Sequence, residues 1–336
     1  MFSSLITRMI LMVGLPIILV NFSLLFSSAS QQKTAALKQA EDLSLATTRE
    51  QSTELQSLIE MALNSANLTS GVFRNVNDMN NPLDMGRESA ALILKGMLGN
   101  DDKFAGVFSV WEPDAFDMMD VAYGGLPGNT EEGRFSPYWK SRPGDAPVLK
   151  VMSDAEINET GGWYEKFRQN PQPNLVWSAE GQALGTGKVL RAMTPIINDG
   201  QYLGVVGVDI GVAVLENMVA QWSNPLLETT VHLHTTKGEL VAPADSEGSG
   251  HHGRKKIQKS DQGIHWDDDV LVICQLVESS LADTGLIVTM EMPRHILLEP
   301  MQTKLKRNVW FGFALILPTL LIVGFLSNGI WPGWFN

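Results

Sequence analysis

The chain has 336 residues and carries 37 acidic against 25 basic side chains, which gives a net charge of −12 at pH 7. Because like charges repel, this excess of carboxylates argues against binding to phosphate backbones, and no nucleic-acid partner is expected. The one cysteine, Cys274, excludes an internal disulfide and a cysteine-based zinc cluster. Its place in the apolar run 270–277 predicts a buried thiol in a strand.

The first predicted element is an apolar span near the N-terminus. Residues 9–26 carry no charge, and 18 such residues are just long enough to cross a bilayer as a helix. Arg8 precedes them, which favours a cytoplasmic N-terminus. We therefore predict a cytoplasmic segment at 1–8 and a transmembrane helix at 9–28. A cleaved signal peptide, ending at the small residues near position 29, is the alternative.

The next segment has helical spacing. Residues 30–66 lack glycine and proline. Small, polar or apolar side chains recur there every three or four residues, namely Leu37, Ala40, Ser44, Thr47, Gln51, Leu55, Leu58, Ala62 and Ser65. This spacing predicts a long helix with a narrow apolar stripe. We interpret residues 29–66 as a stalk helix, which either pairs with a second copy or packs on its own domain.

Short β-type runs follow, separated by turn signals. The predicted strands are 104–111, 148–152, 189–197 and 202–210, and then 230–235, 238–241, 270–277 and 286–292. The sequence Asn-Asp-Gly at 198–200 predicts a hairpin, and Thr-Lys-Gly at 236–238 predicts another turn. The pattern predicts an α+β fold with two modules in series, at 67–220 and 221–307, each built on an antiparallel sheet.

A second apolar span lies close to the C-terminus. It covers residues 309–326 and includes Trp310, a residue type that suits the membrane interface. We predict a transmembrane helix at 308–328 and a short tail at 329–336. The basic residues at 304–307 would then lie on the outer side, against the positive-inside preference, and a buried core helix is the alternative.

Recognised catalytic and metal-binding patterns are missing from the sequence. The glycine-rich run 181–188 ends in Gly-Lys, but Val189 follows where a phosphate loop needs Ser or Thr. His251 and His252 are adjacent, and no two histidines have the four-residue spacing of a helical zinc site. We therefore expect no enzymatic activity, no metal ion and no cofactor.

Four stretches, taken in order and spacing, resemble one known family. They are VWEPDAFD from Val110, GRFSPYW from Gly133, GWY from Gly162, and TPI from Thr194 leading to GVVGVDI from Gly204. Together they are similar to the double Cache sensor domain of bacterial chemoreceptors, which also serves sensor kinases and cyclic-dinucleotide enzymes. The resemblance covers residues 30–305.

The resemblance implies a long N-terminal helix followed by two PAS-like modules. The membrane-distal module, 67–220, would bind a small molecule, and the membrane-proximal module, 221–307, would relay the signal. It also implies a receptor in the bacterial inner membrane, with its sensor region in the periplasm or outside the cell. A second copy of the chain and cytoplasmic signalling proteins would be its partners.

The resemblance also points to ligand-binding residues. By position, Trp163, Tyr164 and Asp209 would line the pocket. Further candidates are Trp111, Asp117, Asp120, Tyr138 and Trp139. Aromatic faces attract ammonium groups, and a carboxylate accepts charge-assisted hydrogen bonds from an amine. These residues therefore favour a protonated amine or polyamine as ligand.

An amino acid is the alternative ligand. The amino-acid-binding branch of the family grips the ligand carboxylate with an arginine where this chain has Gly161. Arg134 or Arg142 would have to replace it. Each candidate also has a structural interpretation: Trp111 and Trp139 as core aromatics, and Arg134 as an ion-pair partner.

These observations lead to several functional hypotheses. The first is a chemotaxis sensor, with a histidine kinase or diguanylate cyclase as the alternative output. The second is a membrane-tethered binding protein. The third, an extracytoplasmic hydrolase, lacks a recognisable nucleophile and base.

Overall fold

The protein is described by a computed structural model over residues 12, 15–77, 83–99, 103–140, 145–157, 162–178, 188–242, 261–299, 307 and 310. The second predicted transmembrane helix lies outside the described residues, apart from Trp310. Gly161, Arg142, and the adjacent His251 and His252 also lie outside them.

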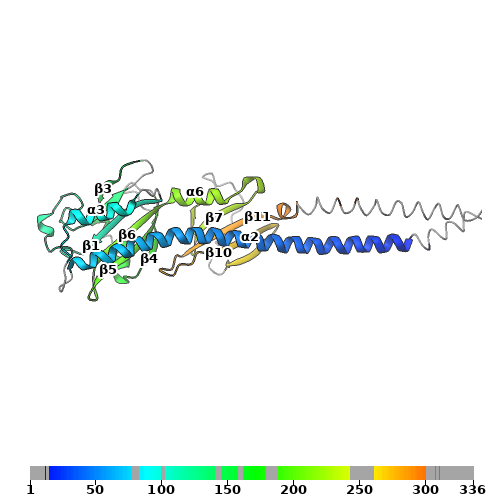
Figure 1. Ribbon diagram of the computed structural model, residues 1–336, viewed down its shortest axis with the longest axis horizontal. Coiled ribbons are helices and arrows are strands. Elements are labelled where there is room, and N and C mark those ends of the chain that lie inside the picture. The colour runs from blue at the N-terminus through cyan, green and yellow to red at the C-terminus, as the bar shows by residue number, and fades with distance from the viewer. Residues whose placement is uncertain are drawn as a thin grey trace, which may run out of the picture.

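Two antiparallel sheets lie one after the other along a long helix (Figure 1). The first sheet has six strands in the order β3-β2-β1-β6-β5-β4. Its strands are β1 (Phe104–Trp111), β2 (Pro137–Lys140), β3 (Val148–Val151), β4 (Asn174–Ser178), β5 (Val189–Asn198) and β6 (Gln201–Gly211).

The second sheet has five strands in the order β8-β7-β11-β10-β9. Its strands are β7 (Thr230–Thr235), β8 (Leu240–Ala242), β9 (Gly263–Asp267), β10 (Val270–Leu276) and β11 (Leu286–Pro293). Cys274 is buried in β10, as the sequence predicts, and this burial raises the pKa of its thiol to about 11.

The long helix is α2 (Leu15–Phe73), which has 59 residues and is therefore about 90 Å long at 1.5 Å per residue. It contacts both sheets. The Ser52 hydroxyl donates to the carbonyl oxygen of Leu276 in the second sheet, at 3.2 Å. The Ser70 hydroxyl donates to the carbonyl oxygen of Pro195 in the first, at 2.6 Å. Leu55, Leu58 and Ala62 of the predicted stripe are buried in the apolar core, so this part of the stripe packs on the chain's own domain.

Shorter helices complete the structure. They are α3 (Arg87–Leu98), α4 (Asp154–Ile157), α5 (Trp163–Gln169) and α6 (Val212–Trp222), with single 3-10 turns η2 (Arg74–Asn77), η3 (Asp120–Ala122) and η4 (Pro225–Leu227). Both α2 and α3 contact the first sheet and share one apolar core with it. A second core lies on the other face of that sheet and includes residues of α4 and α5.

The eight predicted strands are all present, and the predicted α+β class with two antiparallel sheets is confirmed. The hairpin at 198–200 is also confirmed, because Asp199 and Gly200 have positive φ angles of 47° and 79°, as the tight turn requires. The turn at 236–238 forms as well, with the Gly238 N–H donating to the Thr235 carbonyl.

Within the described part of the chain, no helix is both long enough and apolar enough to cross a membrane. The predicted spans at 9–28 and 308–328 and the predicted module boundaries stay predictions.

Candidate functional site

Four of the predicted site residues lie where α5 packs on one face of the first sheet. They are Tyr138, Trp163, Tyr164 and Asp209, and they belong to or contact the second core. This core also contains Phe108, which packs on Tyr138 and Trp163 with ring centroids 6.0 and 5.7 Å apart. The sequence pattern thus brings half of the predicted residues together.

The Asp209 side chain is fully buried and is paired with Arg191 on the neighbouring strand. The Arg191 Nε and Nη2 atoms donate to the two carboxylate oxygens, each at 2.8 Å. The Tyr138 hydroxyl donates to the second oxygen at 3.0 Å. The Arg191 guanidinium lies 4.7 Å from the ring centroids of both Phe108 and Trp163. Burial alone would lower the pKa of Arg191, but its contact with Asp209 raises it.

Two glycines make room for this arrangement. A Cβ atom at Gly207 would overlap the ring of Phe108, and one at Gly106 would overlap the ring of Tyr138. Gly207 belongs to the GVVGVDI segment. Its role in this structure is therefore steric, since it lets the far end of the Phe108 ring approach the strand that carries Asp209.

Trp111 and Trp139 lie on the opposite face of the sheet, which α2 and α3 cover. The Trp111 ring packs against Phe73 of α2 and against Phe116, with centroids 5.9 and 4.9 Å apart. The Trp139 indole N–H donates to the carbonyl oxygen of Ala91 in α3, at 2.6 Å. In this structure, both residues therefore make core contacts apart from the Asp209 cluster.

Asp117 and Asp120 lie in the loop between β1 and β2 and bind Arg87. The Arg87 side chain donates to both Asp117 oxygens at 2.6 and 2.9 Å, and to Asp120 at 2.6 Å. It also donates to the side chain of Asn129 and the carbonyl of Gly133. This network ties the loop to the N-terminus of α3.

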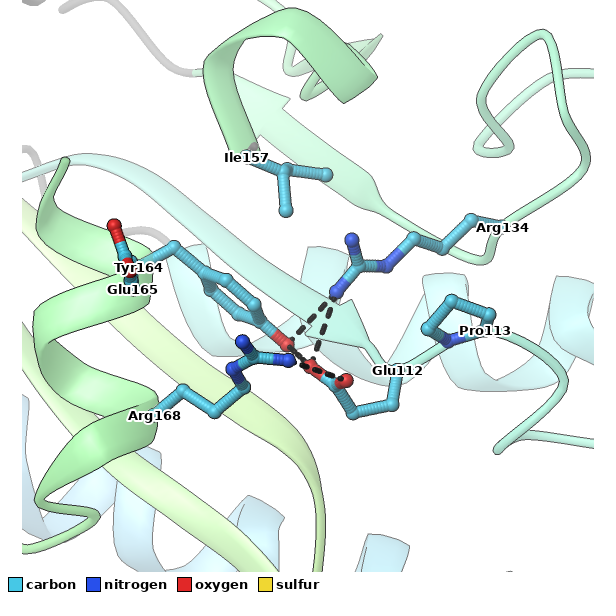
Figure 2. A pocket seen from close by; sticks show the side chains of 7 residues that line it. All are labelled: Glu112, Pro113, Arg134, Ile157, Tyr164, Glu165 and Arg168. Atoms are coloured by element: carbon cyan, nitrogen blue, oxygen red, sulfur yellow. Dashed lines mark hydrogen bonds and ion pairs between the residues drawn. The ribbon is translucent and has the colours of Figure 1, made fainter. Parts of the chain in front are cut away.

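A cavity of about 290 Å³ opens beside the Asp209 cluster, between α5 and the start of the β1–β2 loop. Its lining residues are Glu112, Pro113, Arg134, Ile157, Tyr164, Glu165 and Arg168. Figure 2 shows these side chains around the open space, with Tyr164, Glu165 and Arg168 all coming from α5. Of the eight predicted pocket residues, Tyr164 is in this lining, together with Arg134, which the sequence analysis named as a possible partner of a ligand carboxylate.

Hydrogen bonds organise the base of the cavity. The Tyr164 hydroxyl donates to the Glu112 carboxylate at 2.5 Å and accepts from Arg134 Nη2 at 2.9 Å. Arg134 Nη2 also lies 3.3 Å from the same carboxylate oxygen, and Arg134 Nε donates to the carbonyl of Trp111. Arg168 approaches the other oxygen of Glu112 at 3.5 Å. The carboxylate is therefore held between two guanidinium groups.

Exposure divides these groups into a fixed base and an open rim. The Arg134 side chain is 6% exposed, whereas that of Arg168 is 54% exposed. In Figure 2 the second terminal nitrogen of Arg134 points toward Ile157, without a bond to any residue drawn. Burial, together with the nearby phenol of Tyr202, raises the pKa of Tyr164, so its hydroxyl keeps its proton and remains a donor at neutral pH.

The sequence analysis missed three of the residues that shape this region. Arg191 lies in the apolar run 189–197, where a buried charge requires a partner. Glu112 lies inside a quoted motif, but no role was predicted for it. Arg168 follows Tyr164 by four residues, the spacing that puts two side chains on one face of a helix.

No protein-family model matches the chain. Among curated proteins, it is similar to the methyl-accepting chemotaxis protein TlpQ of Pseudomonas aeruginosa, with 26% identity over 155 residues. The aligned part covers 42% of this chain and 22% of that receptor. The chain thus spans about a fifth of the length of the curated relative that it matches.

Solved structures with the same fold are sensor domains. The extracellular domain of the putative histidine kinase mmHK1S-Z3 superposes with a TM-score of 0.62 at 17% identity, covering 80% of this chain and 98% of that domain. The periplasmic sensory domain of the Campylobacter jejuni chemoreceptor Tlp1 gives 0.56 at 12%, with 79% and 99% covered.

A third structure contains a ligand. It is the ligand-binding domain of the Pseudomonas aeruginosa amino acid chemoreceptor PctC in complex with GABA, with a TM-score of 0.51 at 15% identity, covering 75% of this chain and 99% of that domain. All these proteins are less than 30% identical to the chain, so the likeness concerns the fold. The described chain has the fold of the extracellular and periplasmic sensor domains of chemoreceptors and histidine kinases, as the resemblance to the double Cache domain predicted.

Proposed function

We propose that the chain is the sensing part of a transmembrane chemotaxis receptor and binds a small polar metabolite that carries a carboxylate. The cavity between α5 and the β1–β2 loop is its binding site. The observation that carries this proposal is the guanidinium of Arg134, which lines the cavity although its side chain is only 6% exposed. A buried cationic donor is stabilised when an anionic group binds it.

The rim of the cavity adds a second cation. Arg168 has a mostly exposed side chain and contacts Glu112 only at 3.5 Å, so it can turn to a ligand at little cost. Together, Arg134 and Arg168 suit a planar carboxylate, which guanidinium groups bind through paired hydrogen bonds.

Carboxylates in the lining balance the two arginines. Glu112 and Glu165 both line the cavity. A ligand with an ammonium group as well as a carboxylate would therefore match the site better than a simple acid. The complex of PctC with GABA shows that a sensor domain of this fold binds such a zwitterion. An amine or polyamine held by the glutamates alone is the second candidate.

We propose the topology that the sequence predicts, with transmembrane helices at 9–28 and 308–328 in a bacterial inner membrane and the sensor region outside the cytoplasm. Leu19, Leu24 and Phe26 of α2 are 58%, 63% and 70% exposed, as lipid contact requires. The distal module, 67–220, would bind the ligand. The proximal module, 221–307, would relay the resulting signal toward the membrane.

The curated relative is a chemotaxis receptor, which supports an output to cytoplasmic chemotaxis proteins. We also propose the homodimer that the resemblance to the family implies. A histidine kinase sensor is the second candidate, because such a domain gives a TM-score of 0.62. A diguanylate cyclase sensor and a tethered binding protein are further alternatives from the sequence.

A thermal-shift screen of the purified chain tests the ligand class. Carboxylates, amino acids and amines are compared, and a ligand present at 100 times its Kd stabilises the fold by about 2.7 kcal/mol. We expect shifts from ligands that carry a carboxylate. Shifts from amines alone would contradict the carboxylate proposal, and no shift from any compound would contradict the site itself.

Two arginine variants locate the binding. Arg168→Gln should weaken the binding of a carboxylate ligand by about tenfold, in line with the loss of one charged hydrogen bond. Arg294→Gln is the matched control, because Arg294 also has an exposed side chain and an ion pair at 3.5 Å, but lies next to the second sheet. Equal effects of the two variants would place the ligand elsewhere.

A chimera tests the output. The chain is fused to the cytoplasmic part of a known chemoreceptor and expressed in cells that lack their own receptors. We expect the ligand found in the screen to change the swimming bias. A chimera that binds the ligand without any change in bias would favour the tethered binding protein.

A further inference from the structure

The cluster around Asp209 has the composition of an amine-binding site. Two aromatic faces, those of Phe108 and Trp163, stand beside a buried carboxylate, and the Tyr138 hydroxyl lies on the same carboxylate. Aromatic faces and a carboxylate are the groups that hold organic cations in proteins. We name these four residues the cation cage.

A cation already occupies this cage. We propose that Arg191 is a built-in occupant that fills a cation-binding site of the chain and thereby excludes amines from it. Its guanidinium lies 4.7 Å from both ring centroids and makes two 2.8 Å hydrogen bonds with Asp209. The aromatic contacts and the paired bonds match those expected for a bound guanidinium ligand.

The backbone fixes this occupancy. Arg191 on β5 and Asp209 on β6 are directly opposite partners in the ladder, so their side chains project from the same face at adjacent positions. The Arg191 and Asp209 side chains are 5% and 0% exposed. Arg191 and Tyr138 bind both oxygens of the carboxylate, and its 0% exposure closes it to a second cation from solvent.

The cage and the cavity share helix α5. Trp163 contributes to the cage and Tyr164 to the cavity, and their rings are 5.5 Å apart. Arg191 therefore determines which of two neighbouring sites a ligand can enter. This consequence for ligand choice rests on the proposed function, whereas the occupancy of the cage does not. Removing Arg191 should restore a site for guanidinium and alkylammonium ions.

Chemical rescue of Arg191→Ala tests the proposal. Ethylguanidinium replaces the atoms that this substitution removes, and neutral ethylurea has a similar shape without the charge. In the purified full chain, we expect ethylguanidinium at millimolar concentrations to raise the Tm of Arg191→Ala in a saturable manner. The wild-type chain should not respond, and ethylurea should have no effect on either protein.

A double variant separates cage binding from general effects. Arg191→Ala combined with Asp209→Asn keeps the vacated space but loses the carboxylate, so its affinity for ethylguanidinium should be at least about tenfold lower. If Arg191→Ala does not fold by itself, its refolding yield with and without ethylguanidinium replaces the Tm as the readout. The double variant then serves as the folding control.

The outcomes distinguish the two proposals. Equal responses of the wild-type chain, the single variant and the double variant, or no response in any of them, would overturn the built-in occupant. Neither result depends on the cavity beside Arg134. Conversely, a wild-type chain that ignores every carboxylate but whose Arg191→Ala variant is rescued would reject the proposed cavity ligand and keep the cage.

Discussion

The cation cage and the cavity lie side by side on one sheet and use the same residue types, but they differ in access. In the cage, the Arg191 side chain is 5% exposed and binds a carboxylate with no exposure. In the cavity, Arg168 is 54% exposed and shares Glu112 with the buried Arg134. A sealed ion pair stabilises one arrangement of the chain, whereas an open one can exchange its partner for a ligand. The exposure of an arginine side chain therefore distinguishes a structural ion pair from a ligand-binding one better than the residue type does.

The largest expected effect comes from breaking the sealed pair. Asp209→Ala leaves the Arg191 cation buried without its carboxylate, and this should lower the free energy of unfolding by about 3–5 kcal/mol. Urea unfolding measures it. Replacing both partners, as in Arg191→Met with Asp209→Leu, should cost less than the single change. A double variant that is as unstable as the single one would show that the pair is not the cause.

The next effect tests the shape of the cage. Gly207→Ala places a methyl group against the ring of Phe108, so we expect a loss of about 1–3 kcal/mol from overpacking. Gly96→Ala in α3 is the control, because a Cβ atom there meets no atom within 4 Å and should stabilise the helix slightly. Similar unfolding midpoints for the two variants would contradict the close contact.

Tyr164, at the base of the cavity, should make the free energy of unfolding depend on pH above about pH 10. Burial raises the pKa of Tyr164 above its ordinary value of about 10, so the folded state keeps a proton that the unfolded state loses. The resulting stabilisation is complete below about pH 10 and decreases above it, by about 1.4 kcal/mol per pH unit. Tyr164→Phe should remove this contribution to the slope. Urea unfolding between pH 9 and 11 compares the variant with the wild-type chain; parallel curves would argue against a buried phenol.

The smallest effect belongs to the open rim. Arg168→Gln should change the free energy of unfolding by less than about 0.5 kcal/mol, since its ion pair is solvated and long. A loss above 1 kcal/mol would mean that Arg168 supports the fold and would weaken the contrast with the cage.

Much of the fold could be predicted from local patterns. The strands of the β5–β6 hairpin and their turn were visible as apolar runs around Asn-Asp-Gly at 198–200. Three strands, β2, β4 and β9, were missed. β2 and β4 are short and begin with Pro137 and Asn174, residues that are uncommon in strands. α3 was missed although Ala91, Leu94 and Leu98 have the spacing of a helix with one buried face.

The partner of Arg191 was beyond the sequence for a specific reason. Counted from the turn, with Asn198 opposite Gln201, a regular ladder would place Arg191 opposite Val208. A register shift between Ile196 and Ile197 moves the pairing by one residue and brings Asp209 opposite Arg191. Such a shift changes which side chains of the two strands lie opposite each other on one face. No turn or motif in the sequence predicts it. The resemblance to the family named Asp209 as a pocket residue, but it did not indicate the contact with Arg191.

The continuity of α2 has a consequence for how the protein unfolds. One uninterrupted helix of 59 residues supports both sheets, through Ser52 at Leu276 and through Ser70 at Pro195. If one sheet melted, its half of the helix would lose its apolar cover while the other half stayed docked. The two sheets should therefore melt cooperatively, as a single calorimetric transition rather than two.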